Sequence, residues 1–161
     1  MAKAKPIPDL GADDAYAEAA AKIVEVRTSE LLEHAHGVLD TEDIERVHDM
    51  RVATRRLRAA LEIFEPCFPA KPYREALAEV KRLADALGER RDRDVAIVSL
   101  RGFTRQVAAP DRRGVDSLLE RFRVEQGQTN EELAPLVGDG HLRPLRESME
   151  ELVRGARQVA A

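Results

Sequence analysis

Apolar side chains recur every three to four residues through most of the chain, which is the period of an amphipathic α-helix. The first such stretch covers residues 11–39. A second runs from about Thr41 to Glu65, where Pro66 ends it because proline lacks the N–H that continues helical hydrogen bonding. The proline-rich segment 66–72 predicts a loop. No stretch of useful length has the two-residue period of a strand.

The second half of the chain predicts further helices of the same kind. A third is expected over Tyr73–Leu87 and is ended by Gly88, and a tight turn at residues 88–92 leads to a fourth. The apolar residues of this fourth helix are Val95, Ile97, Val98 and Leu100. A fifth helix is expected from about Asp111 to Leu133, and a turn at residues 138–140 precedes the last one. The pattern predicts an all-α fold, an antiparallel helical bundle of about five to six helices.

Length and composition fit one globular domain. The 161 residues are 43% hydrophobic and 35% charged, so we expect a flexible N-terminal tail at residues 1–10 and a single domain over residues 11–161. A single cysteine, Cys67, excludes an internal disulfide and predicts a buried residue in a reducing compartment. The chain shows no signal-peptide pattern and no apolar run long enough to span a membrane, so we expect a cytoplasmic location.

The net charge of −4 conceals an uneven distribution of charge. Residues 9–45 carry eleven acids and two bases, a net charge of −9. Residues 46–113 carry sixteen bases and ten acids, a net charge of +6. The middle of the chain is therefore basic although the whole chain is acidic, and an anionic partner is expected there.

Residues 47–64 concentrate this positive charge on one side of a predicted helix. With about 100° between successive residues, His48, Arg51, Arg55 and Arg58 share a sector narrower than a quarter-turn. The adjoining sector is apolar and contains Val47, Met50, Leu57, Leu61 and Phe64. The basic stripe therefore borders the core side of the helix, and we expect it at the edge of a groove.

The arginines of this stripe lack the acidic neighbours that usually accompany them. Pairs of opposite charge three or four residues apart stabilise a helix by about 0.2–0.5 kcal/mol, yet Arg51 and Arg55 have no acid at these positions and Arg58 has only Glu62. The pattern favours an anion, and guanidinium groups about 5 Å apart along a helix suit a chain of phosphates. Nucleic acid is a weaker candidate because aromatics, which stack on bases, make up only 4% of the chain.

Two motifs together resemble the CHAD family, the conserved histidine α-helical domain. The first is H-x-x-R-x-x-x-R-x-x-R, formed by His48, Arg51, Arg55 and Arg58, and the second is KRLADALGERRDRDV at residues 81–95. The resemblance covers about residues 11–153. It implies an all-helical domain that binds inorganic polyphosphate in a basic groove and has no catalytic activity of its own. Some members are joined to a triphosphate-processing domain.

The resemblance also implies which residues bind. It assigns polyphosphate binding to His48, Arg51, Arg55, Arg58, Lys81 and Arg91. Three further basic residues are weaker candidates, namely Arg56, Arg82 and Arg90: the first points to another side of the helical wheel, and the other two lie outside the shared pattern. Family members usually contain two such helical halves, whereas this chain shows one, so we expect a homodimer in which a second copy supplies the missing wall of the groove.

Other functions are open at this point. His48 also fits a histidine phosphotransfer or dimerisation module, although the proline that usually follows such a histidine is missing. Hydrolysis of polyphosphate would require carboxylates that hold Mg²⁺, and the nearby acids are Asp85, Asp92 and Asp94. An accessory role beside a polyphosphate- or triphosphate-processing enzyme is a further alternative. We expect no catalytic residue, no metal ion and no cofactor.

Overall fold

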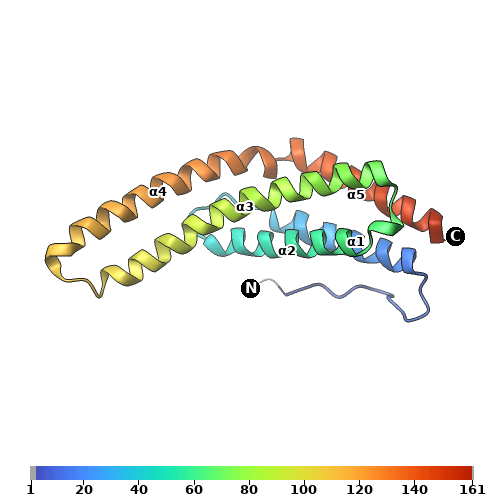
Figure 1. The fold of residues 1–161 in the computed structure, drawn as a ribbon, viewed down its shortest axis with the longest axis horizontal. Helices are drawn as coiled ribbons and strands as arrows, with labels where there is room; N and C mark the ends of the chain where they lie inside the picture. Colours follow the sequence, from blue (N-terminus) through green and yellow to red (C-terminus); the bar gives the residue numbers. More distant parts are fainter. Residues whose placement is uncertain (1–2, 161) are drawn as a thin grey trace.

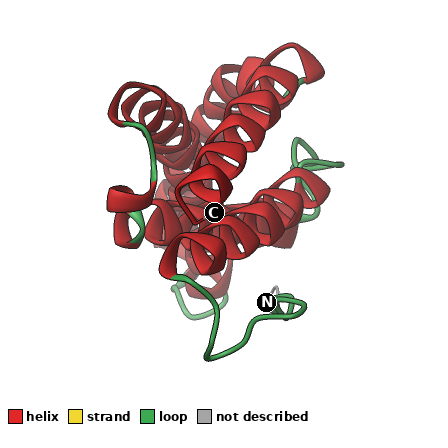
Figure 2. Cartoon of the chain, turned by 90° about the vertical axis from the view of Figure 1, so that its right-hand side faces the viewer, coloured by secondary structure: helices red, strands yellow, loops and turns green. Residues whose placement is uncertain are grey.

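A computed structural model describes residues 3–160, and over that range the chain is helical without any strand. Its elements are α1 (Tyr16–His34), α2 (Ile44–Ile63), the short 3₁₀ helix η1 (Glu65–Cys67), α3 (Ala70–Thr104), α4 (Ala109–Val137) and α5 (Asp139–Ala160). Seen from the end near the C-terminus, the helices pack against one another and the loops lie at the edges (Figure 2). The prediction of an all-α helical bundle is confirmed.

All five α-helices contribute to the hydrophobic core, α4 through Leu133. Leu31 of α1, Leu57 of α2, Leu83 of α3 and Leu152 of α5 are each 0% exposed and belong to one apolar cluster. Cys67 in η1 is also buried against this core, as the sequence predicted. The core therefore holds α2 and α3 side by side, which determines where their polar faces meet.

Helix α3 differs from the prediction, because it continues through Gly88 without a turn. Its buried positions are spaced alternately by three and four residues from end to end: Tyr73, Ala76, Val80, Leu83, Leu87, Arg90, Asp94 and Ile97. A glycine inside a helix lowers the stability of the helix by about 1 kcal/mol relative to alanine. The buried residues of α3 before and after Gly88 offset this loss by their packing. The predictions of a turn at residues 88–92 and of a separate fourth helix are wrong. Lys81 and Arg91 therefore belong to the same helix.

Helices α3 and α4 form a long hairpin that extends past the other helices (Figure 1). We call its projecting part, residues 95–124, the arm. Where the arm leaves the bundle, the side-chain amide of Gln126 donates a hydrogen bond to Asp94 Oδ1 at 2.6 Å. Several apolar side chains of the arm are about half exposed, among them Val98 (51%) and Phe103 (53%). The arm is therefore a two-helix extension with little core of its own.

The first described residues run beside α1 as an extended segment (Figure 1). The backbone N–H of Lys5 donates to Glu30 Oε1 at 2.5 Å, and Arg27 donates to the Lys5 carbonyl at 2.9 Å. Of the predicted tail, residues 1 and 2 lie outside the described residues, and its flexibility stays a prediction. Between residues 3 and 160, no helix combines the length and the apolar character that crossing a bilayer requires.

Candidate functional site

The direction of the basic side chains on α2 follows from its buried side. Val47, Met50 and Leu57 are 0% exposed, so α2 is anchored to the core by this stripe. The predicted basic residues follow the neighbouring stripe, where His48, Arg51 and Arg58 are partly buried and Arg55 is exposed. The arrangement of apolar and basic residues around α2 in the structure is therefore the one expected from the helical wheel.

Helix α3 brings two more predicted residues to this stripe. Lys81 Nζ lies 3.8 Å from Glu62 Oε1 near the end of α2, and Arg91 donates to the carbonyl of Ile44 at its beginning, at 3.1 Å. Because numbers rise along α3 as they fall along α2, the two helices are antiparallel. We call the surface that these side chains form the α2–α3 basic surface, and it consists of His48, Arg51, Arg55, Arg58, Lys81 and Arg91.

Gly88 lies at the middle of this surface. A β-carbon added at Gly88 would stand 3.9 Å from Nε of Arg51, so the Arg51 side chain reaches across to the α3 backbone. Gly88 was predicted to end a helix, but in the structure it allows Arg51 of α2 to lie close to α3. Sequence reasoning missed this role because it depends on the pairing of two helices.

Acidic residues stand at both ends of the α2–α3 basic surface. Glu62 accepts a hydrogen bond from Arg58 Nε at 2.9 Å and also faces Lys81, while Glu45 lies 3.6 Å from Arg91 Nη1. Sequence spacing predicted the pair between Arg58 and Glu62, but the role of Glu45 comes only from the fold.

The middle of the surface has no such acid. Within residues 3–160, neither Arg51 nor Arg55 forms an ion pair with a carboxylate. Their positive charge is therefore concentrated between two ends that are partly neutralised.

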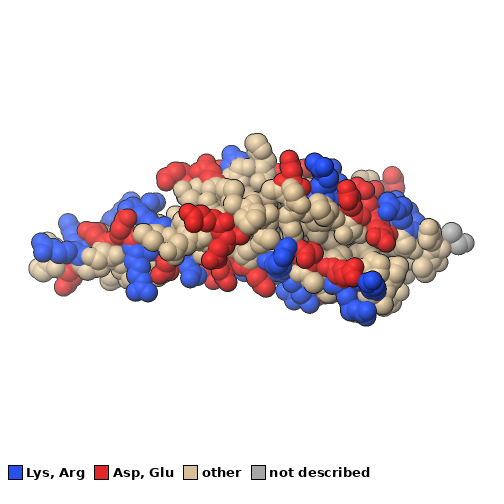
Figure 3. Space-filling view, turned by 90° about the horizontal axis from the view of Figure 1, so that it is seen from above, with Lys and Arg blue, Asp and Glu red and all other residues tan. Residues whose placement is uncertain are grey.

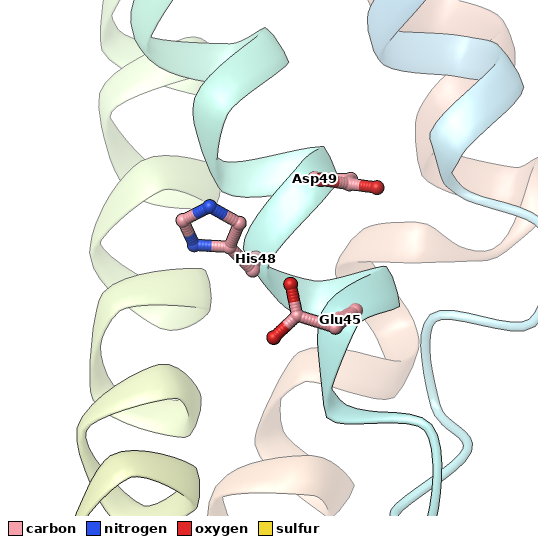
Figure 4. Close-up of side chains that lie close together, drawn as sticks. All are labelled: Glu45, His48 and Asp49. Atoms are coloured by element: carbon pink, nitrogen blue, oxygen red, sulfur yellow. The ribbon is translucent and has the colours of Figure 1, made fainter. Parts of the chain in front are cut away.

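His48 belongs to a small group of possible metal ligands. Ligand atoms of Glu45, His48 and Asp49 all lie within 4.8 Å of one another. The His48 ring extends from α2 toward α3, whereas the Asp49 carboxylate points the other way (Figure 4). A cation already stands beside Glu45, namely the Arg91 guanidinium at 3.6 Å, and this position opposes a metal ion there.

The three weaker candidates face other helices. Arg56 Nη1 lies 3.9 Å from Glu30 of α1, and Arg82 donates to Glu79 at 2.8 Å and reaches the His141 ring of α5. Arg90 is 0% exposed and donates to Asp94 at 2.7 Å, beside α4. These residues stabilise contacts between helices, and the structure brings none of them to the α2–α3 basic surface.

Burial dominates the titration of the pair between Arg90 and Asp94. It raises the pKa of the Asp94 carboxyl and lowers the pKa of the Arg90 guanidinium, because each loses water, and their contact offsets part of this effect. Nε and Nη2 of Arg90 have no hydrogen-bond partner among the described residues. The pair is therefore costly to separate, since each charge would remain in the interior without the other.

The acids considered for hydrolysis do not converge. Asp94 is held by Arg90 and Gln126 in the interior, whereas Asp85 and Asp92 are exposed. Within residues 3–160, the possible metal ligands that lie within 4.8 Å of one another are those of Glu45, His48 and Asp49, and none of these three aspartates belongs to that group. Their arrangement gives no support to a Mg²⁺-dependent hydrolytic site.

The fold and the site together define a class of protein: an antiparallel α-helical bundle with a basic surface between two neighbouring helices. The family model for the CHAD domain matches residues 22–161, nearly the whole chain. The chain therefore belongs to the CHAD family, as its two basic motifs indicated. A search of curated proteins found no match to it.

Proposed function

We propose that this chain binds linear inorganic polyphosphate along the α2–α3 basic surface and does not turn it over. The observation that carries the proposal is the convergence of two helices, with Arg51 lying against Gly88 and Arg91 anchored at Ile44. A row of cations about one helical turn apart matches a polymer that repeats the same anionic group. Membership of the CHAD family supports the choice of polyphosphate.

The ion pairs that Glu62 forms with Arg58 and Lys81 do not oppose binding strongly. Arg58 and Lys81 keep 41% and 44% of their side chains exposed, and exposed ion pairs contribute about 0–1 kcal/mol. Hydrogen bonds from arginine to a charged phosphate are worth about 1.5–3 kcal/mol each. A polyphosphate chain can therefore displace Glu62 from its two partners and bind Arg58 and Lys81.

The proposal that the polymer is not turned over is supported by the side chains of the surface. The basic side chains supply charge and hydrogen bonds, and the exposed Asp85 and Asp92 do not form a metal-binding group with Asp94. Incubating the protein with long-chain polyphosphate and Mg²⁺ should release no orthophosphate. Treatment with a phosphodonor should leave no acid-labile phosphohistidine, and its appearance on His48 would favour the phosphotransfer alternative.

We also propose that a second copy completes the site. The surface is open on its outer side, because Arg55 is exposed and Arg58 and Lys81 are nearly half exposed. A second α2–α3 basic surface facing the first would surround the polymer with cations from both sides. Light scattering should show a dimer in the presence of polyphosphate, and a strict monomer with and without it would rule this arrangement out.

The double variant Arg51→Ala/Arg55→Ala tests the binding proposal directly. Neither arginine has an acidic partner within residues 3–160, so the variant should stay folded while its affinity for polyphosphate falls by about a hundredfold or more. Wild-type affinity should also fall steeply with salt, because binding releases counterions from the polymer. Fluorescence titration at several salt concentrations measures both effects.

A matched control removes the same charge elsewhere. Arg143 and Arg146 are exposed on α5 and have no carboxylate partner within residues 3–160. The variant Arg143→Ala/Arg146→Ala should keep its affinity within about threefold, a difference of less than 1 kcal/mol. Equal losses in the two variants would show that only net charge matters and would contradict the proposed surface.

A further inference from the structure

A second group of arginines, all of them exposed, lies at the far end of the arm. A cavity of about 550 Å³ lies between the end of α3 and the beginning of α4, and its lining includes Arg101, Arg105 and Arg112, with Thr104, Asp116 and Leu119. Within residues 3–160 none of these arginines forms an ion pair, and Arg112 donates only to the carbonyl of Val107, at 3.2 Å. Three cations therefore share one cavity with a single acid.

Two arginines further along α4 form ion pairs with nearby glutamates. Arg121 lies 3.1 Å from Glu125, four residues on, and Arg123 lies 3.4 Å from Glu120, three residues back. Such pairs are the ordinary arrangement on a solvated helix. In the view over α4 and α5, basic side chains are prominent near the free end of the arm, with a few acidic ones among them (Figure 3). The arginines at the end of the arm lack such pairs, and the excess of three cations over one acid in this cavity suits an anion.

A smaller cavity lies between the end of the arm and the beginning of α2. It measures about 270 Å³ and lies where the segment before α2 meets the base of the arm. Arg101 lines both cavities, and Ile44, whose carbonyl accepts the hydrogen bond from Arg91, lines the smaller one. The smaller cavity therefore has Arg101 in its lining together with Ile44, the residue that Arg91 contacts.

Of the two acids at the smaller cavity, one is already paired with an arginine. Glu42 and Asp94 both line the smaller cavity, and Arg101 and Arg123 line it as well. Asp94 is balanced by the buried Arg90 at 2.7 Å, so its charge is largely compensated before any ligand arrives.

We propose that the polyphosphate site extends along α3 onto the arm, so that a long chain contacts Arg101, Arg105 and Arg112 after leaving the α2–α3 basic surface. This inference rests on the proposed function and adds a preference for chain length. Lys81 and Arg105 are 24 residues apart, of which α3 covers all but the last, and this corresponds to about 36 Å along the helix axis. Tripolyphosphate is far shorter than this and fits the α2–α3 basic surface alone.

The test compares tripolyphosphate with long-chain polyphosphate on three proteins. Wild type should bind the long chain more tightly than tripolyphosphate. The arm variant Arg101→Ala/Arg105→Ala/Arg112→Ala should keep the wild-type affinity for tripolyphosphate and bind the long chain about tenfold or more weakly, with a shallower salt dependence. The control Arg143→Ala/Arg146→Ala/Arg154→Ala removes the same charge from exposed positions of α5 and should behave as wild type. Circular dichroism checks that each variant is folded.

Each other result overturns the inference in a recognisable way. An arm variant that binds the long chain as tightly as wild type shows that the arm is not part of the site, while the proposed function survives. An equal loss in the α5 control shows that the effect is one of net charge. If wild type binds neither phosphate, the proposed function fails together with the extension.

Discussion

Nε of Arg51 on α2 lies close to the backbone of α3 at Gly88, where an added β-carbon would stand 3.9 Å away. This distance is an ordinary van der Waals contact, so a methyl group fits at this point without displacing Arg51. The contact joins the arginine at the centre of the basic stripe to the helix that supplies Lys81 and Arg91. Mutations of Gly88 can therefore distinguish an effect on helix stability from an effect on ligand binding.

Replacing Gly88 by alanine should stabilise the protein. The substitution removes a mid-helix glycine and meets no short contact, so we expect a gain of about 0.5–1 kcal/mol in the free energy of unfolding. Affinity for polyphosphate should change by less than about twofold, which is well below 1 kcal/mol. Gly88→Glu, in contrast, places a carboxylate beside Arg51 and should reduce that affinity strongly. Urea denaturation and fluorescence titration measure the two effects, and equal affinities for both variants would contradict the site.

Removing the charge of Glu62 should strengthen binding. Glu62 lies 2.9 Å from Arg58 and 3.8 Å from Lys81, so the ligand must displace it from both cations. Glu62→Gln should raise the affinity for polyphosphate several-fold and change stability by less than about 1 kcal/mol. Glu132→Gln, an exposed acid on α4, is the matched control and should have no effect. An unchanged affinity in the Glu62 variant would place the polymer away from this end of the surface.

Breaking the buried pair between Arg90 and Asp94 should destabilise the arm and its junction with the bundle. Both side chains are 0% exposed, and Asp94→Ala leaves the Arg90 charge in the interior without its partner, a loss of about 3–5 kcal/mol. The double variant Arg90→Met/Asp94→Leu should recover most of this loss, because it removes both charges. Chemical denaturation of the three proteins checks the prediction, and a double variant less stable than Asp94→Ala would contradict it.

The attachment of the N-terminal segment should weaken in acid. Burial by itself raises the pKa of Glu30, but hydrogen bonds from the Lys5 backbone and from Arg27 outweigh it and hold the pKa below its ordinary value. Since the unfolded chain then binds the proton more readily, the stabilisation is complete above about pH 4.3 and is lost as pH falls through the folded-state pKa. In Glu30→Gln the fall in stability over this range should be smaller, and an unchanged pH profile would assign the effect to other carboxyls.

Much of the fold could be predicted from periodicity, whereas the course of α3 could not. Leu83 and Leu87 signal a buried stripe, but the same stripe continues through Arg90 and Asp94, which a search for apolar residues passes over. Only the contact between these two charges, with Gln126 of α4 beside them, makes those positions part of the interior. For this reason the sequence predicted that the helix ends at Gly88, whereas α3 continues through it.

The sequence by itself determined the helical class, the family and the basic stripe of α2, because helical periodicity and local charge spacing are properties of neighbouring residues. Tertiary structure alone decided which basic residues of α3 join that stripe. Lys81 and Arg91 face α2, whereas Arg82 turns to α5 and Arg90 to the interior, since the direction of each depends on how α3 packs against three other helices. The arginines of the arm became a candidate site for the same reason: α3 and α4 bring them together across a turn.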